Sequence, residues 1–100
     1  DVEIVRWPSA AAFFEAHGTD ELHLFTGKTM KRMEEAAYNP GCYLLFGRES
    51  RGIDQEYLDL YQENCVRIPM RPHERSLNLS NAVAIASYEA LRQNGYPGLE

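Results

Sequence analysis

Apolar and polar residues follow one another along the chain in short blocks that predict strands and helices in turn. Candidate strands occupy residues 2–7, 21–26, 42–46 and 65–70, and the run at 42–46 is almost continuously apolar, as in strands buried on both faces. Helical patterns cover residues 10–17, 53–64 and 80–94, while residues 27–41 predict a loop with one helical turn. Strands that alternate with helices predict an α/β domain whose mainly parallel sheet is flanked by helices.

The predicted helices begin and end at residues that favour those positions. Ser9 and Asp54 can cap the first two helices, and Gly18 can end the first. Small alanines would let the last helix approach a neighbour closely, either within the domain or across a two-fold interface. Its apolar stripe predicts a broad buried face formed by Leu79, Ala82, Val83, Ile85, Ala86, Ala90 and Leu91.

Length and composition predict one domain, residues 1–100, because 100 residues with 44% hydrophobic content can form one modest core. The formal charge of −5 argues against binding nucleic acid through bulk positive charge, although a local basic patch can still contact phosphates. Cys42 and Cys65 lie outside CxxC or Cys/His ligand spacings, so they predict reduced, buried thiols and no metal site. With no membrane-length apolar run and no signal-peptide pattern, the sequence predicts a soluble, cytoplasmic protein.

Two polar loops each follow a predicted strand. In the first, Gly47 and Gly52 bound the segment GRESRG, in which Arg48, Glu49 and Arg51 bring both signs of charge together. Glycines allow a positive φ or a close approach to a ligand, and open α/β sheets bind ligands beyond the carboxyl ends of their strands. On these residues alone, however, a solvated turn with local ion pairs is the commoner explanation.

The second loop, residues 71–79, leads into the last helix and is rich in short polar side chains. Such side chains at a helix start can bind a carboxylate or phosphate group. Helix capping explains one or two of them but not readily all four, which are Ser76, Asn78, Ser80 and Asn81.

The two loops together resemble the signature motifs of a known family. LLFGRESRGI (residues 44–53), followed by RIPMRPHERSLNLSNAVAIASYEALRQ (residues 67–93), is similar to the second and third motifs of the SPOUT methyltransferases. Within that class the chain most resembles the tRNA (cytidine(34)-2'-O)-methyltransferases, which methylate the 2'-hydroxyl of the tRNA wobble nucleotide. The resemblance is tight from Cys42 to Gly98 and looser back to Leu22.

The resemblance implies a SPOUT α/β fold with a C-terminal trefoil knot and with S-adenosylmethionine bound at the knot. Such a knot is an exception to the rule that chains do not thread their own loops. The resemblance implies no metal. An apolar slot beside an unobstructed Gly47 would hold the adenine, so a side chain added at Gly47 is expected to fill the pocket. The implied cofactor positions are Phe25, Gly47, Ile68, Ser76 and Leu77, with Tyr88 supporting the pocket from the last helix.

The implied reaction is in-line methyl transfer to a ribose 2'-oxygen, for which positioning of the two reactants matters most. Glu49, Ser76 and Asn78 fall on the family's polar positions around the cofactor and the accepting ribose. Arg48 and Arg51 are expected to contact RNA phosphates, with plain surface charge as the alternative. The implied partners are a tRNA anticodon stem-loop and a second copy of the chain, joined through the alanine-rich last helix.

One part of the family pattern is missing from these 100 residues. The family begins with a first motif, a strand and a loop that contains Asn, Gly and a catalytic Arg, and no segment here matches it. We therefore expect the chain to be a fragment that lacks the N-terminal strand and first motif of its domain. The alternatives are a related enzyme acting on ribosomal RNA and a non-catalytic module that binds the cofactor or a partner.

Overall fold

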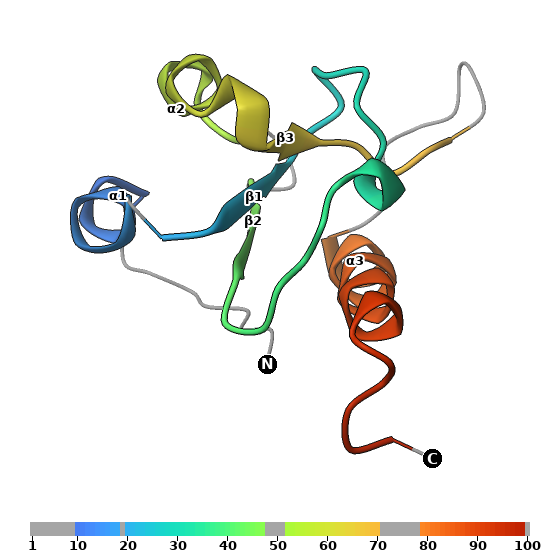
Figure 1. Cartoon of the computed structure of the whole chain (residues 1–100). Coiled ribbons are helices and arrows are strands. Elements are labelled where there is room, and N and C mark those ends of the chain that lie inside the picture. Colours follow the sequence, from blue (N-terminus) through green and yellow to red (C-terminus); the bar gives the residue numbers. More distant parts are fainter. Residues whose placement is uncertain (1–9, 19, 48–51, 71–78, 100) are drawn as a thin grey trace.

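The computed structural model describes residues 10–18, 20–47, 52–70 and 79–99. The strand predicted at residues 2–7 and the predicted cap Ser9 lie outside these ranges. The elements shown in Figure 1 follow the predicted α/β order, including one helical turn in the 27–41 loop, and no helix among the described residues is long and apolar enough to cross a bilayer. They are α1 (Ala10–His17), β1 (Leu22–Phe25), η1 (Met33–Glu35), β2 (Tyr43–Phe46), α2 (Gln55–Leu60), η2 (Gln62–Asn64), β3 (Cys65–Val66) and α3 (Leu79–Gln93).

The three strands form one parallel sheet in the order β2-β1-β3, which confirms the predicted parallel arrangement. The strand predicted at 65–70 is shorter than expected, because β1 ends at Phe25 and offers no partner beyond Val66. Arg67 pairs instead with the loop after β1: its N–H donates to Lys31 O at 2.8 Å, and its carbonyl accepts from Met33 N at 2.8 Å. The parallel pairing therefore continues into irregular chain.

Helices cover both faces of the sheet, as predicted, with α1 and α2 on one face and α3 on the other (Figure 1). Side chains alternate between these faces along each strand because the strand period is two residues. The face under α1 and α2 buries Phe13, Leu22, Leu24, Leu58 and Cys65. The face under α3 buries Phe25, Ala36, Tyr38, Cys42, Leu44, Val66, Ala86 and Ala90.

Aromatic stacking holds α1 against α2. The Phe14 ring stacks on Tyr57 with a centroid separation of 4.2 Å and on Tyr61 at 4.9 Å. Asp54 occupies the predicted N-cap position of α2, where its carbonyl accepts from the N–H of Tyr57. The single helix predicted at 53–64 is wrong, since the backbone of Tyr61 (φ −113°, ψ 37°) separates α2 from the 3-10 turn η2. Asn64 in that turn donates to Leu22 O at 2.8 Å and so fixes the turn to β1.

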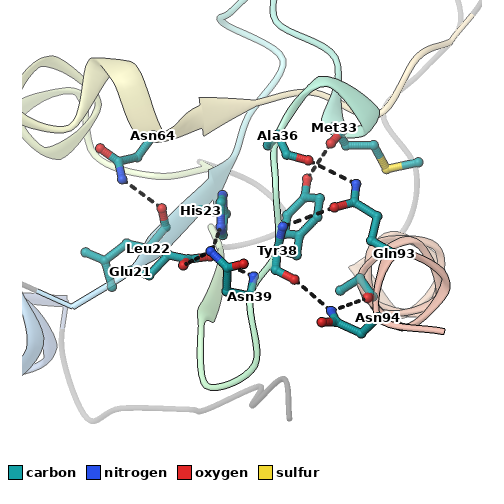
Figure 2. Close-up of polar contacts among 11 residues, drawn as sticks. Glu21, Leu22, His23, Met33, Ala36, Tyr38, Asn39, Asn64, Gln93 and Asn94 are labelled. Atoms are coloured by element: carbon teal, nitrogen blue, oxygen red, sulfur yellow. Dashed lines mark hydrogen bonds and ion pairs between the residues drawn. The ribbon is translucent and has the colours of Figure 1, made fainter. Parts of the chain in front are cut away.

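Small residues and amides attach α3 to the rest of the fold. Ala86 and Ala90 are fully buried, but Ile85 is 38% exposed, so the predicted buried stripe was too wide. At the end of the helix, the Gln93 side chain accepts from Tyr38 N at 3.1 Å and donates to Ala36 O at 2.9 Å (Figure 2).

Asn94 and the Tyr38 hydroxyl complete this attachment. Asn94 Nδ2 donates to Tyr38 O at 2.7 Å, and the Tyr38 hydroxyl donates to Met33 O at 2.7 Å. Burial raises the pKa of Tyr38, and Glu89 adds to the effect, so the hydroxyl keeps its proton for this bond.

Candidate functional site

The carboxyl ends of the three strands meet at one edge of the sheet. Phe25 pairs with Phe46 on one side and with Val66 on the other, and Thr26 N donates to Val66 O at 2.9 Å. In the sequence, the two loops singled out above follow β2 and β3, whose ends lie at this edge. Open α/β sheets bind ligands at such an edge, so this is the candidate site.

The floor of this edge is apolar. Phe25 stacks on Phe46 with a centroid separation of 4.9 Å and an interplanar angle of 16°. Ile68 and Met33 pack against the same core cluster while remaining partly exposed. Phe25 itself is only 8% exposed, so its side chain forms the floor of the site, and Phe46 and Ile68 offer the accessible apolar surface.

Gly47 is constrained by its own chain. A Cβ atom built on Gly47 would lie 1.9 Å from the carbonyl carbon of Gly52, so the backbones at the two ends of this loop pass too closely for any side chain. Gly52 adopts φ +70°, a conformation that other residues rarely take. A side chain at Gly47 would therefore collide with the backbone of Gly52, which is a reason for glycine at this position in addition to the expected room for a ligand.

The remaining predicted site residues either lie away from this edge or fall outside the described ranges. Tyr88 lies on α3 and is 60% exposed, on the side of the helix turned away from the buried Ala86 and Ala90. The structure thus brings Phe25, Gly47 and Ile68 to one edge. Six predicted residues lie outside the described ranges: Arg48, Glu49, Arg51, Ser76, Leu77 and Asn78.

A basic loop at the same edge was missed by the reading of the sequence. The loop after β1 carries Lys28, Lys31 and Arg32, and all three are exposed. Arg67 holds this loop in place, because its guanidinium donates to Thr29 O at 3.5 Å in addition to its two backbone bonds. Lys28 Nζ donates to Gln55 Oε1 at 3.4 Å, which places it beside the start of α2.

The spacing of the cations could have revealed this loop. Eight of the ten Lys and Arg residues lie in the three segments that follow β1, β2 and β3, although the whole chain is acidic. Among the described residues, the exposed Lys28, Lys31 and Arg32 and the apolar floor at the strand ends suit a ligand that combines phosphate groups with a flat ring system. The eight are Lys28, Lys31, Arg32, Arg48, Arg51, Arg67, Arg71 and Arg75.

Solved structures share the fold of this chain. A structure from work on the 2-OH methylation of C/U34 on tRNA is 42% identical, with a TM-score of 0.78 over 88% of this chain and 57% of that one. An RNA 2'-O ribose methyltransferase is 32% identical, with a TM-score of 0.69 over 83% of this chain and 31% of that one. The fold is therefore that of the SPOUT class of RNA methyltransferases, as the sequence motifs predicted.

Sequence comparison identifies the family. The SpoU rRNA Methylase family matches residues 1–88, and the chain belongs to it. The tRNA (cytidine(34)-2'-O)-methyltransferase of Escherichia coli K12 is 45% identical over 96 residues, which cover 95% of this chain. That of Aeromonas hydrophila is 43% identical over 97 residues. The chain spans 61% and 62% of the lengths of these two relatives.

Proposed function

We propose that the protein containing this chain transfers a methyl group from S-adenosylmethionine to the ribose 2'-hydroxyl of the wobble nucleotide, position 34, of a tRNA. The observation that carries this proposal is the 45% identity, over 95% of the chain, to an Escherichia coli enzyme named for that reaction. The Lys and Arg residues that follow the three strands in the sequence, of which Lys28, Lys31 and Arg32 are exposed, support an RNA substrate, because phosphate contacts position RNA without reading its sequence. We also propose the trefoil knot of the SPOUT class and a cytoplasmic location.

The described residues fit an adenosyl group at the strand ends. Phe46 and Ile68 provide accessible apolar surface over the buried Phe25, which suits a purine ring. Gly47 and the chain at residues 76–77 would supply backbone hydrogen bonds. When bound, S-adenosylmethionine supplies a methyl group on a positively charged sulfur. An oxygen nucleophile can attack the methyl carbon, and the sulfur then leaves as the neutral thioether.

The chain's own polar residues would orient the ribose and remove its proton. Of Glu49, Ser76 and Asn78, only the Glu49 carboxylate can accept a proton near neutral pH, so we assign it that role. Ser76 and Asn78 would hold the 2'-hydroxyl by hydrogen bonds in line with the methyl group. Arg48 and Arg51, together with Lys28, would contact the phosphates of the anticodon stem-loop.

A homodimer is part of the proposal. Ile85 and Tyr88 lie three residues apart on α3 and are 38% and 60% exposed, so they share one side of the helix and form a small apolar patch that a partner can cover. A second α3 could cover this surface in a two-fold contact, in which the same residues of both copies meet.

The test uses the full-length protein that contains this chain. The protein is incubated with labelled S-adenosylmethionine and tRNA transcripts that carry either a normal or a 2'-deoxy wobble nucleotide. We expect methylation of the normal transcript alone, and an Asn78→Ala variant should bind the cofactor but transfer the methyl group at least about tenfold more slowly.

Three other results would overturn this assignment in favour of named alternatives. Methylation of the 2'-deoxy transcript would place the reaction elsewhere on the tRNA. Methylation of ribosomal RNA alone would favour the rRNA enzymes that give the family its description. Cofactor binding by calorimetry without transfer to any of these RNAs would favour a non-catalytic module.

A further inference from the structure

Three potential metal ligands meet at the amino ends of β1 and β2, at the end of the sheet opposite the candidate site. They are Glu21, His23 and Cys42, whose ligand atoms all lie within 4.8 Å of one another. No close spacing joins Cys42 to the other two in the sequence. They meet because β1 and β2 are parallel and in register: Leu22 pairs with Tyr43, which places Glu21 opposite Cys42.

The sheet geometry points all three side chains to one face. Residues two apart on a strand share a face, so Glu21 and His23 lie on the same side of β1 as the buried Phe25. Cys42 precedes β2 by one residue and belongs to the core on that side. A backbone hydrogen bond of 2.9 Å from Tyr43 N to Glu21 O fixes the separation of the two strands at this point.

The donor set and its surroundings suit zinc. Thiolate sulfur, imidazole nitrogen and carboxylate oxygen are the ligands that Zn²⁺ takes in proteins. Cys42 is 1% exposed and His23 is 7% exposed, so the sheet and α3 exclude most water from two of the ligands. The side chain of Glu21 is 34% exposed, which leaves one direction open to solvent for a fourth, exchangeable ligand.

A second group of contacts orients the ligands. Asn39 holds both oxygens of the Glu21 carboxylate, through its N–H at 3.1 Å and its Nδ2 at 2.8 Å (Figure 2). The Tyr38 ring packs against the His23 ring at a centroid distance of 4.4 Å. Ligands of bound metals are commonly held in this way by hydrogen bonds from neighbouring groups.

Protons and a metal ion would compete for the same atoms of this cluster. The His23 ring bonds to Glu21 through Nε2 and Oε2 at 2.8 Å, and a metal ion would take the place of the proton between them. An ion bound there would displace the thiol proton into solvent and balance the two negative ligands.

We propose that Glu21, His23 and Cys42 form a zinc site with three protein ligands and one position open to solvent. The site lies away from the edge assigned to methyl transfer and does not depend on that assignment. Binding would join the amino ends of β1 and β2 directly, so the bound ion should stabilise the sheet against unfolding.

Cobalt provides the direct test, because Co²⁺ occupies zinc sites and gives an intense charge-transfer absorption when a thiolate binds it. The full-length protein that contains this chain is stripped of metal with a chelator, checked for folding by circular dichroism and titrated with CoCl₂. Zinc affinity is then measured by competition with a chromophoric chelator. We expect one ion per chain, a thiolate-to-cobalt band that Zn²⁺ removes, and a thermal unfolding midpoint that rises with added Zn²⁺.

Matched variants assign the ligands. Cys42→Ser should abolish the band, whereas Cys65→Ser, which alters the other buried cysteine, should leave it unchanged. Asn39→Ala should weaken zinc binding by roughly 10–100-fold without removing the band. The proposal is overturned if folded parent protein gives no thiolate band, or if Cys42→Ser binds zinc as tightly as the parent does.

Discussion

Gln93 offers a sharp test of how α3 is held, because one amide satisfies two buried backbone groups. Its Oε1 accepts from the N–H of Tyr38, and its Nε2 donates to the carbonyl of Ala36. Tyr38 is 2% exposed and Ala36 is 8% exposed, so water cannot easily replace either bond. The Gln93→Ala variant would leave both backbone groups without their partner.

The magnitude follows from the cost of stranding these groups. Each buried backbone group left without a partner costs about 1–3 kcal/mol. Alanine returns a few tenths of a kcal/mol through its higher helix propensity. We therefore expect the free energy of unfolding to fall by about 1.5–5.5 kcal/mol, a large share of the roughly 5–15 kcal/mol that native proteins possess.

The assay is urea unfolding followed by circular dichroism, with Gln62→Ala as the matched control. Gln62 lies in η2 and is exposed, so its replacement should change the free energy of unfolding by no more than about 0.5 kcal/mol. If Gln93→Ala and Gln62→Ala unfold at the same urea concentration, the two amide bonds do not hold α3 and the reasoning is refuted.

Three further predictions test other contacts. Gly47→Ala should destabilise the chain strongly, because the added Cβ would overlap the Gly52 backbone. Gly27→Ala is the control and should be tolerated, because a Cβ there meets nothing within 4 Å. Equal melting temperatures for the two variants would contradict the close approach of the Gly47 and Gly52 backbones. Hydrogen bonds from Arg92 lower the pKa of Glu89 below its usual 4.5, against the opposing effect of burial. The Glu89 carboxylate therefore stabilises the folded state above the unfolded-state pKa of this group, and that stabilisation is lost as pH falls through its folded-state pKa. Glu89→Gln should therefore be less stable than the parent at neutral pH, with a difference that shrinks in urea titrations below about pH 4; a difference that stays constant with pH would refute the assignment. Replacing Ile85 and Tyr88 together by serine in the full-length protein should change its sedimentation coefficient from that of a dimer to that of a monomer, with no loss of helical circular dichroism. An unchanged sedimentation coefficient would show that α3 does not form the proposed interface.

Local patterns were enough to predict most of the fold. The apolar run at 42–46 and the alternation of strands with helices predicted a parallel sheet, since both signals lie within short windows of sequence. The end of β3 could not be predicted in this way. Arg67 leaves β1 because β1 has ended at Phe25, and its new partners, Lys31 and Met33, lie more than thirty residues away in the sequence.

In the candidate site, too, some features could be predicted from the sequence and others depend on contacts between distant segments. The resemblance assigned Phe25, Gly47 and Ile68 to the cofactor site, and the structure brings these three residues to one edge of the sheet. The reason for glycine at position 47 was missed, because the obstructing group is the Gly52 backbone on the far side of a loop. Ligand spacing likewise failed to connect Cys42 with His23, since the register of two parallel strands joins them and no local motif does.

The amide bonds between α3 and residues 36–38 also have a consequence for the order of folding during synthesis. The partners of Gln93 and Asn94 lie 55–57 residues earlier in the chain, so these contacts close long loops and cannot form early. The amide bonds therefore cannot fasten α3 over the face carrying Phe25, Leu44 and Val66 until residue 94 has left the ribosome. Nascent chains that stall before that point would expose this apolar face to chaperones, whereas the opposite face can already be covered by α1 and α2.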